Sequence, residues 1–225
     1  VLDEIEIKEG VDPSNKQKSE KRQARNYQAF IGEFMRYNSP YRSLLLYHGV
    51  GSGKTCTALM TFNRLYDSNP NWNVYILLKS SLKPTWQDEL NKCLTKDKNY
   101  NDRVKRIHFI TYNSPNSSEI FKRIWTKTRI TSDQSFFIID EIHNFISNVV
   151  SNKLKGKGRS LETYDLITDE LKRNKKSRIL LLSATPIINN PFELGILFNL
   201  LNPGIFPDTE DEFKAWFVKS DPFPK

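Results

Sequence analysis

A glycine-rich turn between two apolar segments constrains the fold of this chain more than any other feature. The segment "SLLLYH" (43–48) is an uninterrupted apolar run typical of a buried strand, and "KTCTALMTFNRLY" (54–66) has a helical pattern. The turn between them places three glycines in five positions. Glycine accepts positive φ and lets other groups approach the backbone closely, at an entropic cost. A turn this rich in glycine therefore indicates a backbone that wraps around a ligand.

A phosphate chain is the ligand that this turn fits best. Successive backbone N–H groups form an anion-binding nest, and the following helix adds its positive N-terminus. Lys54 would reach the terminal phosphates, and the Thr55 hydroxyl would bind Mg²⁺. The full phosphate-loop signature has glycine at position 48, where this chain has His48; the alternative is a glycine-rich turn that precedes a lysine by chance. The predicted nucleotide-binding residues are Gly49, Val50, Gly51, Ser52, Gly53, Lys54, Thr55 and Cys56.

The rest of the chain repeats the alternation of short apolar strands with helices. Further strands are expected at 73–79, 106–111, 135–140 and 178–184. Continuous apolar strands separated by helices predict an α/β fold with a parallel sheet covered on both faces. Ligands of such sheets bind at the carboxyl ends of the strands. The candidate chemical residues all follow strands, in agreement with this rule.

Helices and termini are predicted from local signals. Residues 21–37 carry an apolar stripe at helical spacing, Pro84 begins a further helix, and Ser117 or Ser118 could cap a helix near 118–127. Residues 1–20 are polar and charged and are interpreted as an N-terminal extension of a single domain over 21–225.

Composition narrows the class of protein. With 34 basic and 26 acidic residues, the net charge of +8 makes a polyanionic partner plausible. No apolar run approaches the ~20 residues of a membrane span, and the N-terminus carries no signal-peptide pattern. The two cysteines give neither a disulfide framework nor a metal-binding spacing. We therefore expect a soluble protein without a membrane partner, in a reducing intracellular compartment.

Two adjacent carboxylates end the strand in "FFIIDEIHNF" (136–145). Burial there is costly unless a cation or a water network satisfies them. Beside a phosphate loop, Asp140 would hold Mg²⁺ directly or through water, and Glu141 would position and deprotonate the attacking water. The alternative is a pair of acids stabilised by the dipole at a helix N-terminus.

A basic segment, "SNKLKGKGRS" (151–160), interrupts the regular alternation of elements. One interpretation is a mobile, solvated loop. The other is a loop that contacts nucleic-acid phosphates and becomes ordered on binding. The candidate contacts are Lys153, Lys155, Lys157 and Arg159.

Together these motifs resemble the first lobe of a superfamily 2 helicase, which is a RecA-like sheet. The resemblance spans about residues 24–218 and rests on the order of Gly51–Thr55, Asp140–His143 and Ser183–Thr185. It implies ATP and Mg²⁺ as ligands. It also implies that His143, Ser183, Ala184 and Thr185 couple nucleotide state to the nucleic-acid groove, and that Gln28 reads adenine. The alternative for Gln28 is an exposed polar position on a helix.

Two further segments narrow the branch of that superfamily. "SSLKPTWQDEL" (80–90) and the stretch from Thr185 to about 218 resemble the duplex-DNA translocases of the chromatin-remodelling family. That family usually carries an acid before the glycines and Thr-Gly-Thr as its third motif. His48, Asp-Glu-Ile-His and Ser-Ala-Thr are more similar to ATPases of large cytoplasmic DNA viruses, among them the poxvirus-type nucleoside triphosphatase I and the early transcription factor small subunit.

The resemblance implies a DNA-dependent ATPase that moves along duplex DNA during viral transcription, with RNA polymerase or transcription-factor subunits as partners. Its location would be the host cytoplasm or the virion. The alternatives are an RNA helicase acting on transcripts and a nucleotide-gated docking module of a polymerase complex. A kinase would leave the Asp-Glu-Ile-His and Ser-Ala-Thr motifs unexplained. Nothing after residue 186 resembles the family's second lobe with its arginine finger, so slow turnover is expected of this lobe alone.

Overall fold

The computed structural model describes residues 25–185 and 189–217, so the expected N-terminal extension at 1–20 lies outside the described residues. Five strands form one sheet in the order β1-β5-β4-β2-β3, and every neighbouring pair is parallel. The parallel α/β fold is therefore confirmed. The strands are β1 (Ser43–Tyr47), β2 (Trp72–Leu78), β3 (Ile107–Thr111), β4 (Gln134–Ile139) and β5 (Arg178–Ser183).

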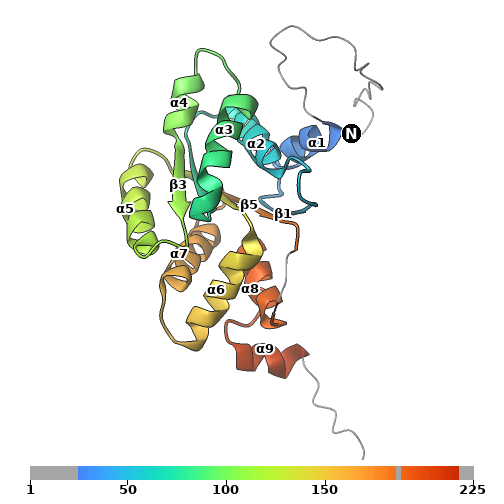
Figure 1. Ribbon diagram of the computed structural model, residues 1–225, viewed down its shortest axis with the longest axis vertical. Coiled ribbons are helices and arrows are strands. Elements are labelled where there is room, and N and C mark those ends of the chain that lie inside the picture. Colours follow the sequence, from blue (N-terminus) through green and yellow to red (C-terminus); the bar gives the residue numbers. More distant parts are fainter. Residues whose placement is uncertain (1–24, 186–188, 218–225) are drawn as a thin grey trace, which may run out of the picture.

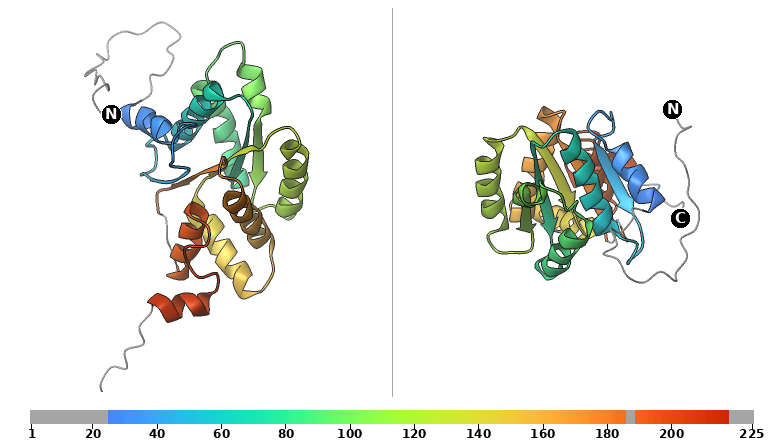
Figure 2. Two further views of the ribbon diagram at one scale, coloured as in Figure 1. Left: turned by 180° about the vertical axis from the view of Figure 1, so that it is seen from behind. Right: turned by 90° about the horizontal axis from the view of Figure 1, so that it is seen from above.

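Helices cover both faces of the sheet, because side chains of a strand alternate between its faces. Val74 and Ile76 pack into one core and Tyr75 and Leu77 into the other, and all four are fully buried. The first core is covered by α1 (Asn26–Phe34), α2 (Lys54–Ser68), α3 (Lys83–Cys93) and α4 (Tyr100–Lys105), with a short 3₁₀ turn, η1 (Ser80–Leu82), before α3. The second is covered by α5 (Ser117–Arg129), α6 (Ile142–Leu154), α7 (Arg159–Arg173), α8 (Phe192–Leu201) and α9 (Glu210–Phe217) (Figures 1 and 2).

Several boundaries differ from those predicted. The helix expected near 118–127 begins at Ser117 after Asn116, and neither serine caps it through its side chain. Residues 21–24 of the helix expected over 21–37 lie outside the described residues, and α1 covers 26–34 of the rest. The helices α4, α6, α7, α8 and α9 were not among those that local signals predicted.

The strand order brings three chain segments to one edge. β5 lies between β1 and β4, and the register pairs Tyr47 with Ser183 and Ile139 with Leu181. The glycine-rich turn after β1, the end of β5 and Asp140 after β4 therefore share the carboxyl edge of the sheet. None of the helices within 25–185 and 189–217 is long and apolar enough to cross a bilayer.

Candidate nucleotide site

The glycine-rich turn joins β1 directly to the first residue of α2. Gly51 (φ 75°) and Gly53 (φ 87°) adopt left-handed backbone conformations, which other residues adopt at a cost. Gly49 has no such conformation. A Cβ at Gly49 or Gly51 would meet no atom within 4 Å, so the outer side of the turn is open to a ligand. A Cβ at Gly53 would lie only 3.1 Å from the Gln28 amide nitrogen.

Two polar groups at this turn, the Lys54 ammonium and the Ser52 hydroxyl, are available to bind an anion. The Lys54 ammonium donates to the backbone carbonyls of His48 (2.8 Å) and Gly49 (3.0 Å). The Ser52 hydroxyl is buried, and among the described residues it has no hydrogen-bond partner. A buried hydroxyl without a partner is costly, and a phosphate oxygen would satisfy it.

α1 lies directly over the turn. The Tyr27 hydroxyl donates to the Ser52 carbonyl, and the Gln28 amide donates to the Gly53 carbonyl over 3.3 Å. The Gln28 amide oxygen accepts the backbone N–H of Arg25 at 3.0 Å. Gln28 is only 6% exposed, so the alternative of an exposed polar position is wrong. Its side chain instead fixes the distance between α1 and the turn.

Asp140 is a buried carboxylate at the end of β4. It is 7% exposed, and its backbone N–H donates to the Leu77 carbonyl at 2.9 Å. One carboxylate oxygen accepts the Glu141 backbone N–H at 3.0 Å. Burial raises the pKa of Asp140, whereas the hydrogen bond from Trp86 and the charge of Lys54 oppose that rise. A cation bound there would relieve the same cost.

Glu141 is held in an unusual backbone conformation. Its φ of 49° makes it the one non-glycine residue with positive φ within 25–185 and 189–217. Such conformations persist where the surrounding structure enforces them, often at functional sites. α6 begins at the next residue, so the alternative of helix N-terminal acids explains the position of the pair. It does not explain the left-handed backbone.

The residues expected to couple nucleotide state to nucleic acid lie together. His143 Nδ1 is 3.4 Å from a Glu141 carboxylate oxygen and 3.1 Å from the Ser183 hydroxyl. Ser183 Oγ also accepts the Thr185 backbone N–H at 3.0 Å, and Ala184 is half-buried between them. A continuous polar path therefore leads from Glu141 to the segment after β5.

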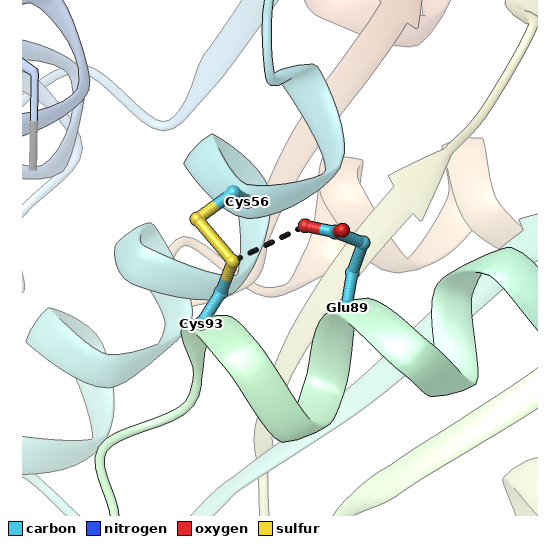
Figure 3. Close-up of side chains that lie close together, drawn as sticks. All are labelled: Cys56, Glu89 and Cys93. Carbon is cyan, nitrogen blue, oxygen red and sulfur yellow. Dashed lines mark hydrogen bonds between the residues drawn. A yellow bond between two sulfur atoms is a disulfide. The ribbon is translucent and has the colours of Figure 1, made fainter. Parts of the chain in front are cut away.

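The two cysteines differ from expectation. Cys56, in the first turn of α2, and Cys93, the last residue of α3, form a disulfide with their Cα atoms 5.4 Å apart (Figure 3). The expectation that the two cysteines give no disulfide framework is wrong because α2 and α3 pack together, and the inferred reducing compartment loses its basis. The Glu89 carboxylate lies 3.4 Å from Cys93 Sγ, and the three potential metal-ligand atoms are within 4.8 Å of one another. Because the sulfurs are bonded to each other, this state offers no pair of thiolates.

The basic segment 151–160 is not a single loop. Residues 151–154 form the last turn of α6, and α7 begins at 159, which leaves a short turn between them. Lys153 donates to the Asp208 carbonyl at 3.0 Å and lies over the Tyr164 ring. The other three candidates, Lys155, Lys157 and Arg159, are exposed. Lys153 thus has partners within the chain, and the phosphate contacts expected of these four residues stay a prediction.

Sequence reasoning missed one side chain at the site. The Trp86 indole N–H donates to the second Asp140 carboxylate oxygen at 2.7 Å, in a buried position. The sequence places Trp86 only within a segment that resembles a family and indicates no role for it. A tryptophan in the first turn of an otherwise polar helix, two residues after Pro84, was the available signal.

Comparisons with known proteins agree with these motifs. A family model described as "Type III restriction enzyme, res subunit" matches residues 16–188. The putative ATP-dependent RNA helicase R350 of Acanthamoeba polyphaga mimivirus is 42% identical over 99% of this chain. Nucleoside triphosphatase I of Melanoplus sanguinipes entomopoxvirus is 31% identical over 83% of this chain. The matched region covers 28% of the length of each of these relatives.

A solved structure shares the fold. The SWI2/SNF2 ATPase core of Sulfolobus solfataricus, determined in complex with double-stranded DNA, matches with a TM-score of 0.56 and 24% identity. The match covers 87% of this chain and 39% of that one. The RecA-like arrangement expected from the motifs is therefore confirmed.

Proposed function

Because this chain belongs to the family described as "Type III restriction enzyme, res subunit" and is a superfamily 2 helicase lobe similar to viral ATPases, we propose that it binds Mg-ATP at the carboxyl edge of its sheet and hydrolyses it. The observation that carries this proposal is the meeting of the open glycine-rich turn with Asp140 and Glu141 at that edge. We assign the lobe to residues 21–225, with 1–20 as an extension.

The turn would hold the phosphates of the nucleotide. Backbone N–H groups of 49–53 and the N-terminus of α2 would donate to the β- and γ-phosphates. The Lys54 ammonium would exchange its two carbonyl acceptors for phosphate oxygens, and the Ser52 hydroxyl would gain the partner it lacks within the described residues. Gln28, whose amide donates to the Gly53 carbonyl, would contact the base.

The residues present fit a divalent cation. Asp140 is a buried carboxylate, and Thr55 offers a hydroxyl at the start of α2. When bound, Mg²⁺ neutralises charge that develops on the transferred phosphoryl group. Glu141 accepts the proton of the attacking water. The path through His143, Ser183 and Thr185 would report the state of the nucleotide to nucleic acid.

Duplex DNA is the proposed polyanion, and movement along it during viral transcription is the proposed task. The net charge of +8 and the sequence resemblance to duplex-DNA translocases support this. The second candidate is an RNA helicase, which the printed name of the mimiviral relative favours. A docking module of a polymerase complex would require nucleotide binding without hydrolysis. RNA polymerase or transcription-factor subunits are the proposed protein partners.

Two substitutions test the ATP site in the full-length protein. Lys54→Ala should abolish Mg-ATP binding measured by calorimetry, because the ammonium that contacts the phosphates is lost. Glu141→Gln should leave binding intact and lower hydrolysis by ~10²–10⁴-fold, the usual effect of losing a general base. Lys127→Ala, an exposed lysine on α5, removes the same charge on the other face of the sheet and is the matched control.

The outcomes separate the assignments. Equal ATP affinity of wild type and Lys54→Ala would remove the phosphate-loop assignment. A fully active Glu141→Gln enzyme would show that another residue activates the water. ATP binding without hydrolysis in the wild-type protein would favour the docking module.

A further inference from the structure

The carboxylate of Asp140 is fixed at both of its oxygens. One oxygen accepts the Glu141 backbone N–H at 3.0 Å, and the other accepts the Trp86 indole N–H at 2.7 Å. Each oxygen of a carboxylate has two acceptor positions. One position on each oxygen therefore stays open while the plane of the group is set.

The indole that sets this plane is itself firmly held. Trp86 is 1% exposed and lies in the first turn of α3, after Pro84. The far end of α3 is joined to the first turn of α2 by the Cys56–Cys93 disulfide. α2 begins with Lys54 and Thr55. Helix α3 therefore links the two parts of the site, because the disulfide joins it to α2 at one end and Trp86 contacts Asp140 at the other.

Packing alone does not account for the direction of this indole N–H. Trp72 on β2 is also completely buried in the same core, yet within the described residues its indole N–H has no hydrogen-bond partner. The core therefore accommodates a tryptophan whose N–H is unused. At Trp86 the N–H points instead at the carboxylate that the proposed function assigns to the cation.

We propose that Trp86 is a positioning residue, which orients the Asp140 carboxylate for the divalent cation that accompanies the nucleotide. This inference rests on the proposed role of Asp140. Outer hydrogen bonds of this kind orient metal ligands, and their loss typically weakens metal binding by about 10- to 100-fold. The nucleotide itself contacts the turn at 49–54, so its affinity without metal should not depend on Trp86.

The test removes the indole N–H donor at position 86. In the full-length protein, Trp86→Phe and a second variant with β-(3-benzothienyl)alanine at position 86 both remove the donor. The second keeps the size of the indole, so it reports on the hydrogen bond even where the first destabilises the fold. Trp72→Phe is the matched control. Mn²⁺ substitutes for Mg²⁺, and its EPR signal measures free ion in the presence of ATP.

Both position-86 variants should require about 10- to 100-fold more Mn²⁺ for half-saturation. Their affinity for a fluorescent ATP analogue in EDTA should equal that of wild type, and Trp72→Phe should match wild type in both measurements. An unchanged Mn²⁺ requirement in the isosteric variant would overturn the inference, as would an equal shift in Trp72→Phe. Asp140→Asn is measured alongside, because an unchanged Mn²⁺ requirement there would refute the proposed role of Asp140 itself.

Discussion

Reduction of the Cys56–Cys93 disulfide should lower the free energy of unfolding of this chain by up to about 4 kcal/mol. The bridge joins residues 37 positions apart. Closing a loop of that length removes about 13 cal/mol/K of entropy from the unfolded chain, which is about 4 kcal/mol at 25 °C. The value is an upper bound, because residual structure in the reduced unfolded chain makes the effect smaller.

The assay is guanidinium denaturation with and without dithiothreitol. With a slope of roughly 5 kcal/mol/M, the reduced protein should unfold about 0.8 M earlier. Its melting temperature should fall by roughly 8–16 °C. The chain has only two cysteines, so mass spectrometry after alkylation in denaturant reports the redox state without ambiguity. The oxidised protein takes up no label, and the reduced protein takes up two.

Cys93→Ser supplies the control, because it lacks the cross-link in either condition. Its denaturation midpoint should not respond to dithiothreitol and should lie near that of the reduced wild type. Coincident midpoints for oxidised and reduced wild-type protein would refute the loop-entropy reasoning. Two labelled thiols in protein purified under oxidising conditions would show that the bridge does not form.

Two further predictions concern the half-buried His108 and the basic turn. Burial, with a smaller effect of the Arg106 charge, lowers the pKa of His108 below 6.5. The folded state therefore binds fewer protons than the unfolded state near this pH. The free energy of unfolding should fall as the pH drops below 6.5, by at most about 1.4 kcal/mol per pH unit. In a pH series of denaturation curves His108→Phe should lose this dependence, and an identical profile would contradict the assignment. Replacing Lys155, Lys157 and Arg159 with alanine should reduce the slope of log affinity for duplex DNA against log salt concentration, measured by anisotropy, by up to about 2.7, whereas Lys153→Ala should leave this slope unchanged. An unaltered slope in the triple variant would leave the turn without a nucleic-acid role. Tighter binding to single-stranded RNA than to duplex DNA would favour the helicase alternative.

Local sequence was sufficient to locate the five strands, the glycine-rich turn and the two acids after β4. The five strands were predictable because each carries a short apolar run. The central strands β2, β4 and β5 are buried along their whole length, whereas β1 and β3 at the two sides of the sheet are only partly buried. The glycine-rich turn was predictable because glycine permits the positive φ that Gly51 and Gly53 adopt. The position of Asp140 and Glu141 after β4 followed from the same local pattern.

Some local predictions went wrong where packing decides. The last turn of α6 contains Lys153, whose ammonium donates to the Asp208 carbonyl, 55 residues away, and lies over the Tyr164 ring. Charge and glycine content alone suggested a loop there. Gln28 was open to an exposed interpretation because nothing adjacent in the chain shows that α1 lies against the glycine-rich turn.

What only the tertiary structure decided are the contacts between distant segments. Cys56 meets Cys93, and Trp86 meets Asp140 54 residues away, because α3 packs beside α2 and across the end of β4. His143 meets Ser183 because β5 is inserted between β1 and β4. Hydrophobic periodicity specifies which face of a helix or strand is buried, but many strand orders and helix placements bury the same faces. The local pattern therefore fixes the elements, and the packing of side chains between them selects which polar groups share the site.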